Sequence, residues 1–320
     1  MPKKTANPKP KPQARPPAKE EQTQEHTGPT RSGTAAIVGR ANVGQSTLLN
    51  AMIGVPLAIT SPKPQTTRDR ILGIATGKGV QIVFVDTPGM HESKTKLGTM
   101  MNREARDAAR DADVVLFMVD SLLPVADDVA IAKELPKNVI LVLNKIDRVT
   151  DKTALFDALT AHAAVRDYLA IVPISAKSGN GVDRVLAEVR SVLPEGEMGY
   201  DDETLTDRPT RFFVAEYVRE QVLKKTREEV PHGVAVVIER FDEALKNGVA
   251  TIEAAIHVDR ESHKRIVVGK GGLMLKEIGI ASRRRIESLL GHRIHLKLWV
   301  RVTPGWYRTD AGLKQMGYTT

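Results

Sequence analysis

The sequence predicts two folded units, an α/β unit with a mostly parallel sheet and a smaller α+β unit behind it. Short apolar runs alternate with helical stretches over residues 33–197, which is typical of parallel strands that helices cover on both faces. An acidic, apolar-poor segment over residues 198–210 predicts a linker. Residues 211–320 then change to the order helix, two strands, helices, strand. The predicted bounds are a helix over Arg211–Glu228, strands over Val234–Glu239 and Gly248–Val258, a helix over Leu273–Leu290 and a strand over Arg293–Val302.

The first segment, residues 1–32, is rich in proline, lysine and glutamine and has almost no large apolar side chains. Such a composition buries too little apolar surface to offset the entropy of ordering, so we expect a disordered basic tail. An inert tail is favoured over one that binds RNA or an anionic surface.

In the first unit, apolar runs of strand length are followed by polar motifs, and stretches with helical periodicity lie between them. The predicted strands are Ala35–Val38, Ile82–Val85, Val114–Val119, Val139–Leu143 and Ile171–Ile174. The predicted helices are Ser46–Ile53, Leu97–Arg110, Lys152–His162 and Val182–Val192. Because ligands bind at the carboxyl ends of parallel strands, the motifs there are the candidate site.

The first motif has the Walker A spacing of a P-loop NTPase, a glycine, four residues and a second glycine at the entry to a helix. Its backbone N–H groups would wrap phosphate oxygens at the helix start. The candidate residues are Gly39, Arg40, Ala41, Asn42, Val43, Gly44, Gln45, Ser46 and Thr47. The hydroxyl of Ser46 is expected to bind Mg²⁺.

Gln45 stands where this motif normally has lysine. Glutamine donates a hydrogen bond but cannot neutralise phosphate charge. A charge-assisted hydrogen bond contributes about 1.5–3 kcal/mol, so we expect weaker nucleotide binding and slower catalysis.

Three further motifs follow strands in the order that predicts a guanine-nucleotide site. The first places a carboxylate near Mg²⁺ and a backbone N–H near a γ-phosphate, and its residues are Asp86, Thr87, Pro88 and Gly89. The second recognises guanine N1–H and the 2-amino group through Asp147 and contains Asn144 and Lys145. The third offers backbone N–H groups to guanine O6 and consists of Ser175, Ala176 and Lys177.

A loop over residues 62–68 lies between the first two motifs and would close on the γ-phosphate. Either Thr66 or Thr67 would complete the Mg²⁺ shell, and the sequence leaves both open. Gln45, Thr66, Thr67 and Gly89 are therefore candidate catalytic residues.

The second unit contains a Gly-x-x-Gly loop between two predicted helices, the arrangement with which KH domains clamp a single-stranded backbone. The candidate RNA-binding residues are Gly269, Lys270, Gly271, Gly272 and Lys276. The order of elements predicts a type II KH domain. The run Arg283 to Arg285 is a candidate RNA contact, with a solvated helix face at least equally favoured for two of its three residues. For Trp306, packing at the domain edge is favoured over base stacking.

Composition limits the classes of function. Net charge is +4 over residues 1–32, −3 over 33–210 and +7 over 211–320, which favours a polyanion partner for the second unit. Cysteine is absent, the histidines lack metal-ligand spacing, and no apolar run reaches about 18 residues, so we expect no thiolate chemistry and no membrane span. A metabolic enzyme would need paired acids or a nucleophile in a pocket, and we find neither.

These motifs resemble the Era family of bacterial ribosome-assembly GTPases, which belongs with the TrmE-Era-EngA-like proteins. The resemblance covers nearly everything after residue 33. It implies slow hydrolysis of GTP to GDP with Mg²⁺, and binding of the 3′ end of 16S rRNA during assembly of the 30S subunit. Met90, a hydrophobic residue after the Asp-Thr-Pro-Gly motif, also fits this family, and it replaces the glutamine that orients water in Ras-like switches.

The resemblance further implies that Asn42 helps to hold K⁺ against the phosphates, which makes it the fifth candidate catalytic residue. It implies a cytoplasmic location, with peripheral contact with the inner membrane as a second location, and no DNA partner is expected. The alternative function is an RNA-binding protein whose nucleotide-impaired first unit is mainly structural.

Overall fold

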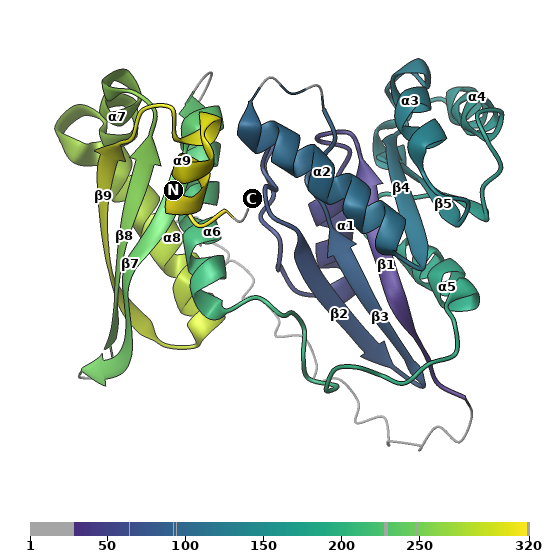
Figure 1. Cartoon of the computed structure of the whole chain (residues 1–320), viewed down its shortest axis with the longest axis horizontal. Coiled ribbons are helices and arrows are strands. Elements are labelled where there is room, and N and C mark those ends of the chain that lie inside the picture. Colours follow the sequence, from purple (N-terminus) through teal and green to yellow (C-terminus); the bar gives the residue numbers. More distant parts are fainter. Residues whose placement is uncertain are drawn as a thin grey trace, which may run out of the picture.

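The computed structural model describes residues 29–63, 65–91, 93, 95–226, 230–246 and 249–318, which form two units lying side by side (Figure 1). The first unit has a six-stranded sheet and the second a three-stranded sheet. The predicted fold class, an α/β unit followed by a smaller α+β unit, is confirmed. No described helix has the length and apolar character to cross a membrane.

The first unit alternates strands and helices as the sequence predicts. Its strands are β1 (Arg31–Gly39), β2 (Ile71–Gly77), β3 (Val80–Asp86), β4 (Val114–Asp120), β5 (Val139–Asn144) and β6 (Ala170–Pro173). Its helices are α1 (Gln45–Ile53), α2 (Lys96–Asp111), α3 (Ala126–Glu134), α4 (Lys152–Ala163) and α5 (Val182–Val192), with a 3₁₀ turn η1 (Ile146–Arg148).

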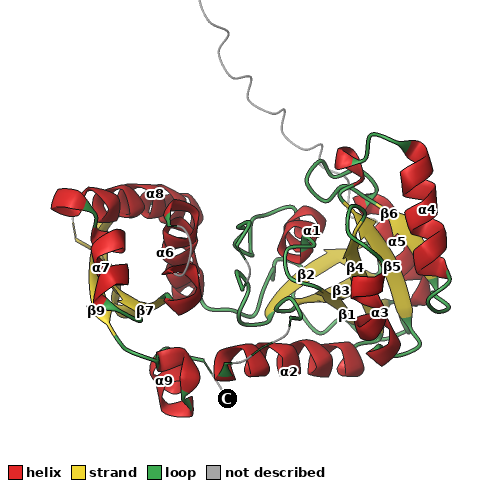
Figure 2. Cartoon of the chain, turned by 90° about the horizontal axis from the view of Figure 1, so that it is seen from above, coloured by secondary structure: helices red, strands yellow, loops and turns green. Residues whose placement is uncertain are grey.

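The sheet order is β2-β3-β1-β4-β5-β6, and only β2 runs antiparallel to its neighbour. Apolar residues of α1 and α5 cover one face, and those of α2, α3 and α4 cover the other. Seen from above, α1 and α2 lie on opposite sides of the sheet (Figure 2). Burial on both faces explains why β4 and β5 consist of uninterrupted apolar runs.

The second unit packs three helices on one face of a mixed sheet. Its elements are α6 (Thr210–Lys225), η2 (Val230–Gly233), β7 (Ala235–Lys246), β8 (Val249–Val258), α7 (Glu261–Val268), η3 (Lys270–Gly272), α8 (Leu273–Leu290), β9 (Arg293–Val302), η4 (Trp306–Arg308) and α9 (Asp310–Gln315). Strand β8 pairs antiparallel with β7 and parallel with β9. One apolar cluster joins α6, α7 and α8 to this sheet.

The structure also contains elements that the sequence reading did not assign. These are the edge strand β2, helix α3 and helix α9. Strand β2 escaped notice because its segment mixes glycine and threonine with apolar residues and is held by antiparallel pairing to β3.

The predicted tail over residues 1–32 overlaps the first strand of the structure by two residues. Arg31 and Ser32 belong to β1, because Arg31 pairs with Val80 and its N–H donates to the Gly79 carbonyl. Residues 1–28 lie outside the described part, as do Glu228 and Gly248, which were assigned to a helix and a strand.

The linker is bound along the sheet. The Gln81 side chain accepts from the N–H groups of Gly199 and Tyr200 and donates to the Tyr200 carbonyl. Further along, the Ile74 N–H donates to the Leu205 carbonyl. The path from the first unit to the second is therefore fixed by hydrogen bonds.

The two units share a buried interface. Leu97 of α2 packs with Trp306 and Leu313 of the second unit, and the Trp306 indole is stacked on Tyr318. The indole N–H donates to the Gly233 carbonyl at 3.0 Å. The expectation that Trp306 packs at the domain edge is confirmed.

A carboxylate on α2, that of Glu104, predicts a pH dependence of stability. Burial and the nearby Asp69 raise the pKa of Glu104 from 4.5 to about 7. The protonated form is thus favoured on folding, so the contribution of Glu104 is complete below pH 4.5 and is lost as pH rises through 7. We expect Glu104→Gln to raise the free energy of unfolding by about 1–2 kcal/mol at pH 8, after discounting for partial exposure.

Urea unfolding of both proteins at pH 5 and pH 8 checks this. The gain should nearly vanish at pH 5, and the exposed control Glu203→Gln should show no such pH-dependent gain. An equal gain at both pH values would contradict the assignment to Glu104 ionisation.

Candidate nucleotide-binding and RNA-binding sites

The phosphate loop joins the end of β1 to the start of α1. Gly44 at the helix start has φ 108°, and a Cβ there would lie 2.4 Å from Asn144 Nδ2. Glycine is required at this position by both conformation and space. Asn42 also has a positive φ, of 66°. The loop therefore brings its backbone N–H groups to the amino end of α1, where an anion binds well.

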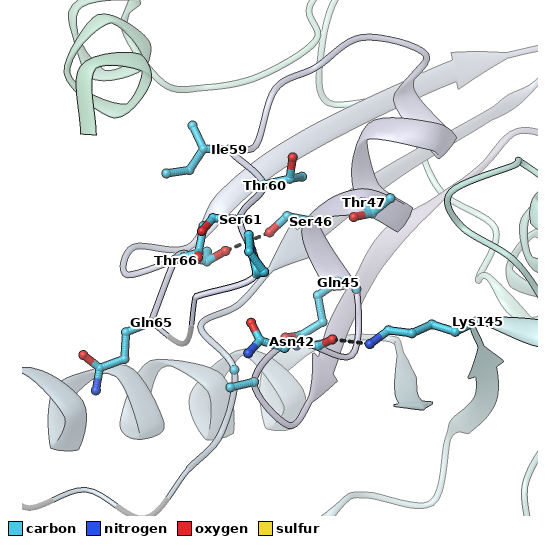
Figure 3. Close-up of a pocket in the computed structure, with 15 residues that line it drawn as sticks. Asn42, Gln45, Ser46, Thr47, Ile59, Thr60, Ser61, Gln65, Thr66 and Lys145 are labelled. Atoms are coloured by element: carbon cyan, nitrogen blue, oxygen red, sulfur yellow. Dashed lines mark hydrogen bonds between the residues drawn. The ribbon is translucent and has the colours of Figure 1, made fainter. Parts of the chain in front are cut away.

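A cavity of about 360 Å³ opens above this loop (Figure 3). The phosphate loop forms one side and the 59–67 segment forms the other. Its lining residues are Ala41, Asn42, Gly44, Gln45, Ser46, Thr47, Ile59, Thr60, Ser61, Pro62, Gln65, Thr66, Thr67, Gly89 and Lys145. All five candidate catalytic residues thus line one cavity.

Gln45 lies at the base of this cavity and is 7% exposed. Its Nε2 donates to the Ile37 carbonyl at 3.2 Å, an acceptor that also receives the Thr87 hydroxyl at 2.8 Å. The side chain is thus held by β1. It brings an amide dipole to the loop and no net positive charge.

Hydroxyl and carboxylate oxygens converge beside the loop. Ser46 Oγ lies 2.7 Å from both Asp86 Oδ2 and Thr67 Oγ1. Asp86 is fully buried, and its Oδ1 has no hydrogen-bond partner within the described residues. Burial raises the pKa of Asp86 to about 7, although the Ser46 hydrogen bond opposes this shift. Such hard oxygen donors with one orphaned buried atom fit Mg²⁺.

The two threonines differ in their surroundings. Thr67 lies in this oxygen cluster, whereas the Thr66 hydroxyl donates to the Lys63 carbonyl at 2.6 Å. The geometry therefore favours Thr67 as the residue that completes a Mg²⁺ shell.

The Asp-Thr-Pro-Gly motif packs directly against the phosphate loop. A Cβ on Gly89 would lie 2.6 Å from Ala41 Cα, so only glycine fits. The next N–H, of Met90, donates to the Gly39 carbonyl at 2.9 Å. The Met90 side chain is buried in the apolar cluster under α2, which leaves it no role in orienting water.

The guanine-recognition motifs lie at the ends of β5 and β6, next to the phosphate loop. The buried amide of Asn144 donates to the Val43 carbonyl at 2.7 Å and accepts from the Ala176 N–H at 3.0 Å. Asn144 thus ties three loops together, a role that its spacing did not reveal. The Ala176 N–H would have to exchange this bond to reach guanine O6.

Lys145 and Asp147 take different positions. The Lys145 ammonium donates to the Asn42 carbonyl at 2.7 Å and to Asp120 at 2.6 Å, which lays its stem across the end of the cavity. Asp147 is exposed in η1 and does not line the cavity. The carboxylate is therefore open to an incoming base.

Sequence reasoning missed two polar residues between the nucleotide loops. The Gln65 amide lies 3.0 Å from His91 Nε2, and His91 is held by Asn102 through its backbone N–H and carbonyl. Gln65 has a positive φ of 59°. The strain and the hydrogen bond were invisible in the sequence, because no spacing rule links these positions.

The Gly-x-x-Gly loop connects α7 to α8 with three positive φ values, at Gly269, Gly271 and Gly272. Lys270 is exposed at its tip. A cleft of about 440 Å³ runs from this loop between α8 and β9. Its lining residues are Gly272, Leu275, Lys276, Gly279, Ile280, Arg283, Ile294, His295, Leu296 and Leu298. An apolar floor with basic rims suits a nucleic-acid strand.

Comparison with known proteins adds to this geometry. Residues 34–145 match the family described as 50S ribosome-binding GTPase, and residues 229–307 match the KH domain family. The chain is similar to GTPase Era of Geotalea uraniireducens, with 47% identity over 292 residues covering 90% of this chain and 98% of the relative. It is 43% identical to GTPase Era of Ruminiclostridium cellulolyticum, covering 91% and 98%.

Two solved structures are similar over the whole described fold. One is an Aquifex aeolicus Era variant bound to GDP·AlF4⁻, and the other is Era in complex with MgGDPNP and nucleotides 1506–1542 of 16S ribosomal RNA. Each has a TM-score of 0.86 and 38% identity, and covers 91% of this chain and 100% of the solved chain.

Proposed function

Because this chain belongs to the Era family of GTPases, we propose that it binds and hydrolyses GTP in its first unit and binds the 3′ end of 16S rRNA through its KH domain. It would thereby assist assembly of the 30S subunit in the cytoplasm. Peripheral contact with the inner membrane stays a prediction from the family resemblance.

The observation that carries this proposal is the convergence of the guanine and phosphate motifs on one edge of the sheet. The Asn144 side chain joins the loops that follow β1, β5 and β6, and the cavity beside it is walled by the 59–67 segment. A phosphate chain would lie along the amino end of α1, with the base toward Asp147.

In this arrangement the chain contributes mainly positioning. Ser46, Thr67 and Asp86 would hold Mg²⁺, which neutralises phosphate charge when bound. The phosphate-loop N–H groups orient the anion, and the Gly89 N–H reaches the γ-phosphate side of the loop. Met90 cannot orient water, so the attacking water must be placed by backbone groups or by the 59–67 segment.

We infer that K⁺ supplies part of the charge that Gln45 lacks. Asn42 lines the phosphate side of the cavity, and its carbonyl is already held by Lys145. Carbonyl and amide oxygens are suitable K⁺ ligands. Hydrolysis should therefore be faster in KCl than in NaCl, and Asn42→Ala should remove that difference.

The RNA site yields a sharp prediction. Gly271 is exposed with φ 60° and has open space around it, a backbone conformation that aspartate tolerates. We expect Gly271→Asp to weaken RNA binding by about tenfold or more, because the added carboxylate would repel a phosphate of the RNA held at this loop. Filter binding with the 16S 3′-end fragment, nucleotides 1506–1542, measures this.

Gly291→Asp is the matched control. Gly291 ends α8 with φ 72° and has the same open surroundings, so it receives the same charge and backbone strain far from the Gly-x-x-Gly loop. An equal loss of RNA affinity in both variants would indicate only a general effect of charge. It would show that the Gly-x-x-Gly loop is not part of the RNA site.

A second candidate function follows from Gln45. With a neutral amide at the loop, the first unit could serve mainly as a scaffold for the KH domain. Isothermal titration with GDP, the GTP analogue GDPNP and an ATP analogue separates the two. GDP and GDPNP binding in preference to adenylates supports the proposed function, whereas RNA binding with no nucleotide affinity supports the scaffold.

A further inference from the structure

The loop that walls the nucleotide cavity is anchored on the KH domain. Leu57 and Ile59 belong to the apolar cluster built around α6, and Tyr217 of α6 donates its hydroxyl to the Pro56 carbonyl at 3.2 Å. The nucleotide cavity is lined by Ile59 itself and by Thr60, Ser61, Pro62, Gln65, Thr66 and Thr67. One wall of the nucleotide site therefore belongs to the core of the other unit.

Arg219 of α6 also contacts this loop, and its side chain is 1% exposed. Its Nη2 donates to the Thr66 carbonyl, and its Nε donates to Glu216 at 2.8 Å. Thr66 immediately precedes Thr67, whose hydroxyl lies 2.7 Å from Ser46. A single peptide thus separates the buried guanidinium from the oxygen cluster that fits Mg²⁺.

Glu220 is the next residue of α6 and is fully buried. One carboxylate oxygen accepts from the Thr60 N–H at 3.2 Å, and the other accepts from Arg285 of α8. Lys224 also lies 3.1 Å from this carboxylate. The Arg285 guanidinium stacks on the Tyr217 ring, with 4.2 Å to its centroid.

Helix α8 begins directly after the Gly-x-x-Gly loop and lines the cleft proposed for RNA. Arg285 contacts Glu220 and Tyr217 of α6, while Lys276 and Arg283 of the same helix line the RNA cleft. A shift of α8 on RNA binding would change the Arg285–Glu220 pair, and through it the Thr60 backbone.

We propose that Arg219 is a positioning residue for GTP binding and hydrolysis, and that Glu220 and Arg285 couple the 59–67 loop to RNA bound at the KH domain. This rests on the proposed function. Arg219 fixes the peptide between Thr66 and Thr67, so that the Thr67 hydroxyl faces the cation and γ-phosphate. Because coupling between two binding sites is reciprocal, RNA changes nucleotide affinity by the same factor by which nucleotide changes RNA affinity.

Arg219→Lys tests the positioning role. Lysine keeps the charge, but its single ammonium group cannot reproduce the planar guanidinium that donates to both Glu216 and the Thr66 carbonyl. We expect affinity for GDPNP to fall by about tenfold and affinity for GDP to stay unchanged, since GDP has no γ-phosphate for the loop to meet. Equal losses for both nucleotides, or no loss, would overturn the positioning role. Circular dichroism verifies that the variant is folded.

Arg285→Met tests the coupling without disturbing the Thr66 contact, and Arg284→Met is the control. Arg284 is exposed on the same helix, so its replacement removes the same charge. The readout is the ratio of GDPNP affinities with and without saturating 16S 3′-end fragment. We expect a ratio of about fivefold or more in the parent and in Arg284→Met, and a ratio near one in Arg285→Met. A parent ratio of one, or an unchanged ratio in Arg285→Met, would overturn the coupling.

These measurements are made in the chain itself and in the Gln45→Lys background. Failure of guanine nucleotides to bind in either background would reject the proposed function, and this inference with it. Normal binding of nucleotide and RNA, with ratios insensitive to Arg219 and Arg285, would reject this inference alone.

Discussion

Replacing Gln45 with lysine is expected to raise affinity for GTP by about ten- to a hundred-fold. The Gln45 side chain lies at the base of the phosphate cavity, where its amide is bonded to a β1 carbonyl and adds no charge. Lysine at this position would bring an ammonium group to the β- and γ-phosphates. The gain in hydrolysis rate should exceed the gain in affinity, because phosphoryl charge is redistributed in the transition state.

Isothermal titration with GDP and GDPNP, together with single-turnover phosphate release, measures both effects. Gln315→Lys adds the same charge to an exposed position on α9 and should leave both unchanged. Equal GTP affinity and equal hydrolysis rates in the parent and in Gln45→Lys would contradict this account of Gln45.

Asp147→Asn is expected to lower affinity for GDP by about a hundredfold or more, because two N–H groups of guanine lose a charged acceptor. The exposed carboxylate follows β5 on the same sheet edge as the phosphate loop. Asparagine presents one acceptor and one donor in its place. The variant should therefore gain affinity for xanthine nucleotides, whose 2-oxo group accepts a hydrogen bond.

Competition of GDP, XDP and ADP against a fluorescent nucleotide reads this base preference. Asp157→Asn removes the same charge from the exposed side of α4 and should leave the preference unaltered. Adenylate binding by the parent, or an unchanged preference in Asp147→Asn, would show that Asp147 does not read the base.

The motifs were predictable because each depends on residues close in sequence at the end of a strand. The apolar runs of β4 and β5 and the glycines of the phosphate loop express local requirements for burial and backbone conformation. Strand β2 was missed because its pairing partner decides its structure.

Long-range polar contacts were beyond the reach of sequence patterns. Nothing in the spacing of Asn144 indicates that its amide joins Val43 to Ala176, and nothing links Arg219 to Thr66. Such pairs are created by the packing of elements far apart in the chain. The preference for Thr67 over Thr66 likewise depends on the position of Ser46.

The shared core also limits how this chain can be divided. A fragment that starts at α6 would lose Leu57 and Ile59 from its apolar cluster and would leave Arg219 without the Thr66 carbonyl. A fragment that ends before the linker would expose Leu97 and Met101, which pack against the carboxyl-terminal residues. A chimera that joins one unit of this chain to the other unit of a distant homologue would therefore also need the homologue's contact residues on the unit that is kept.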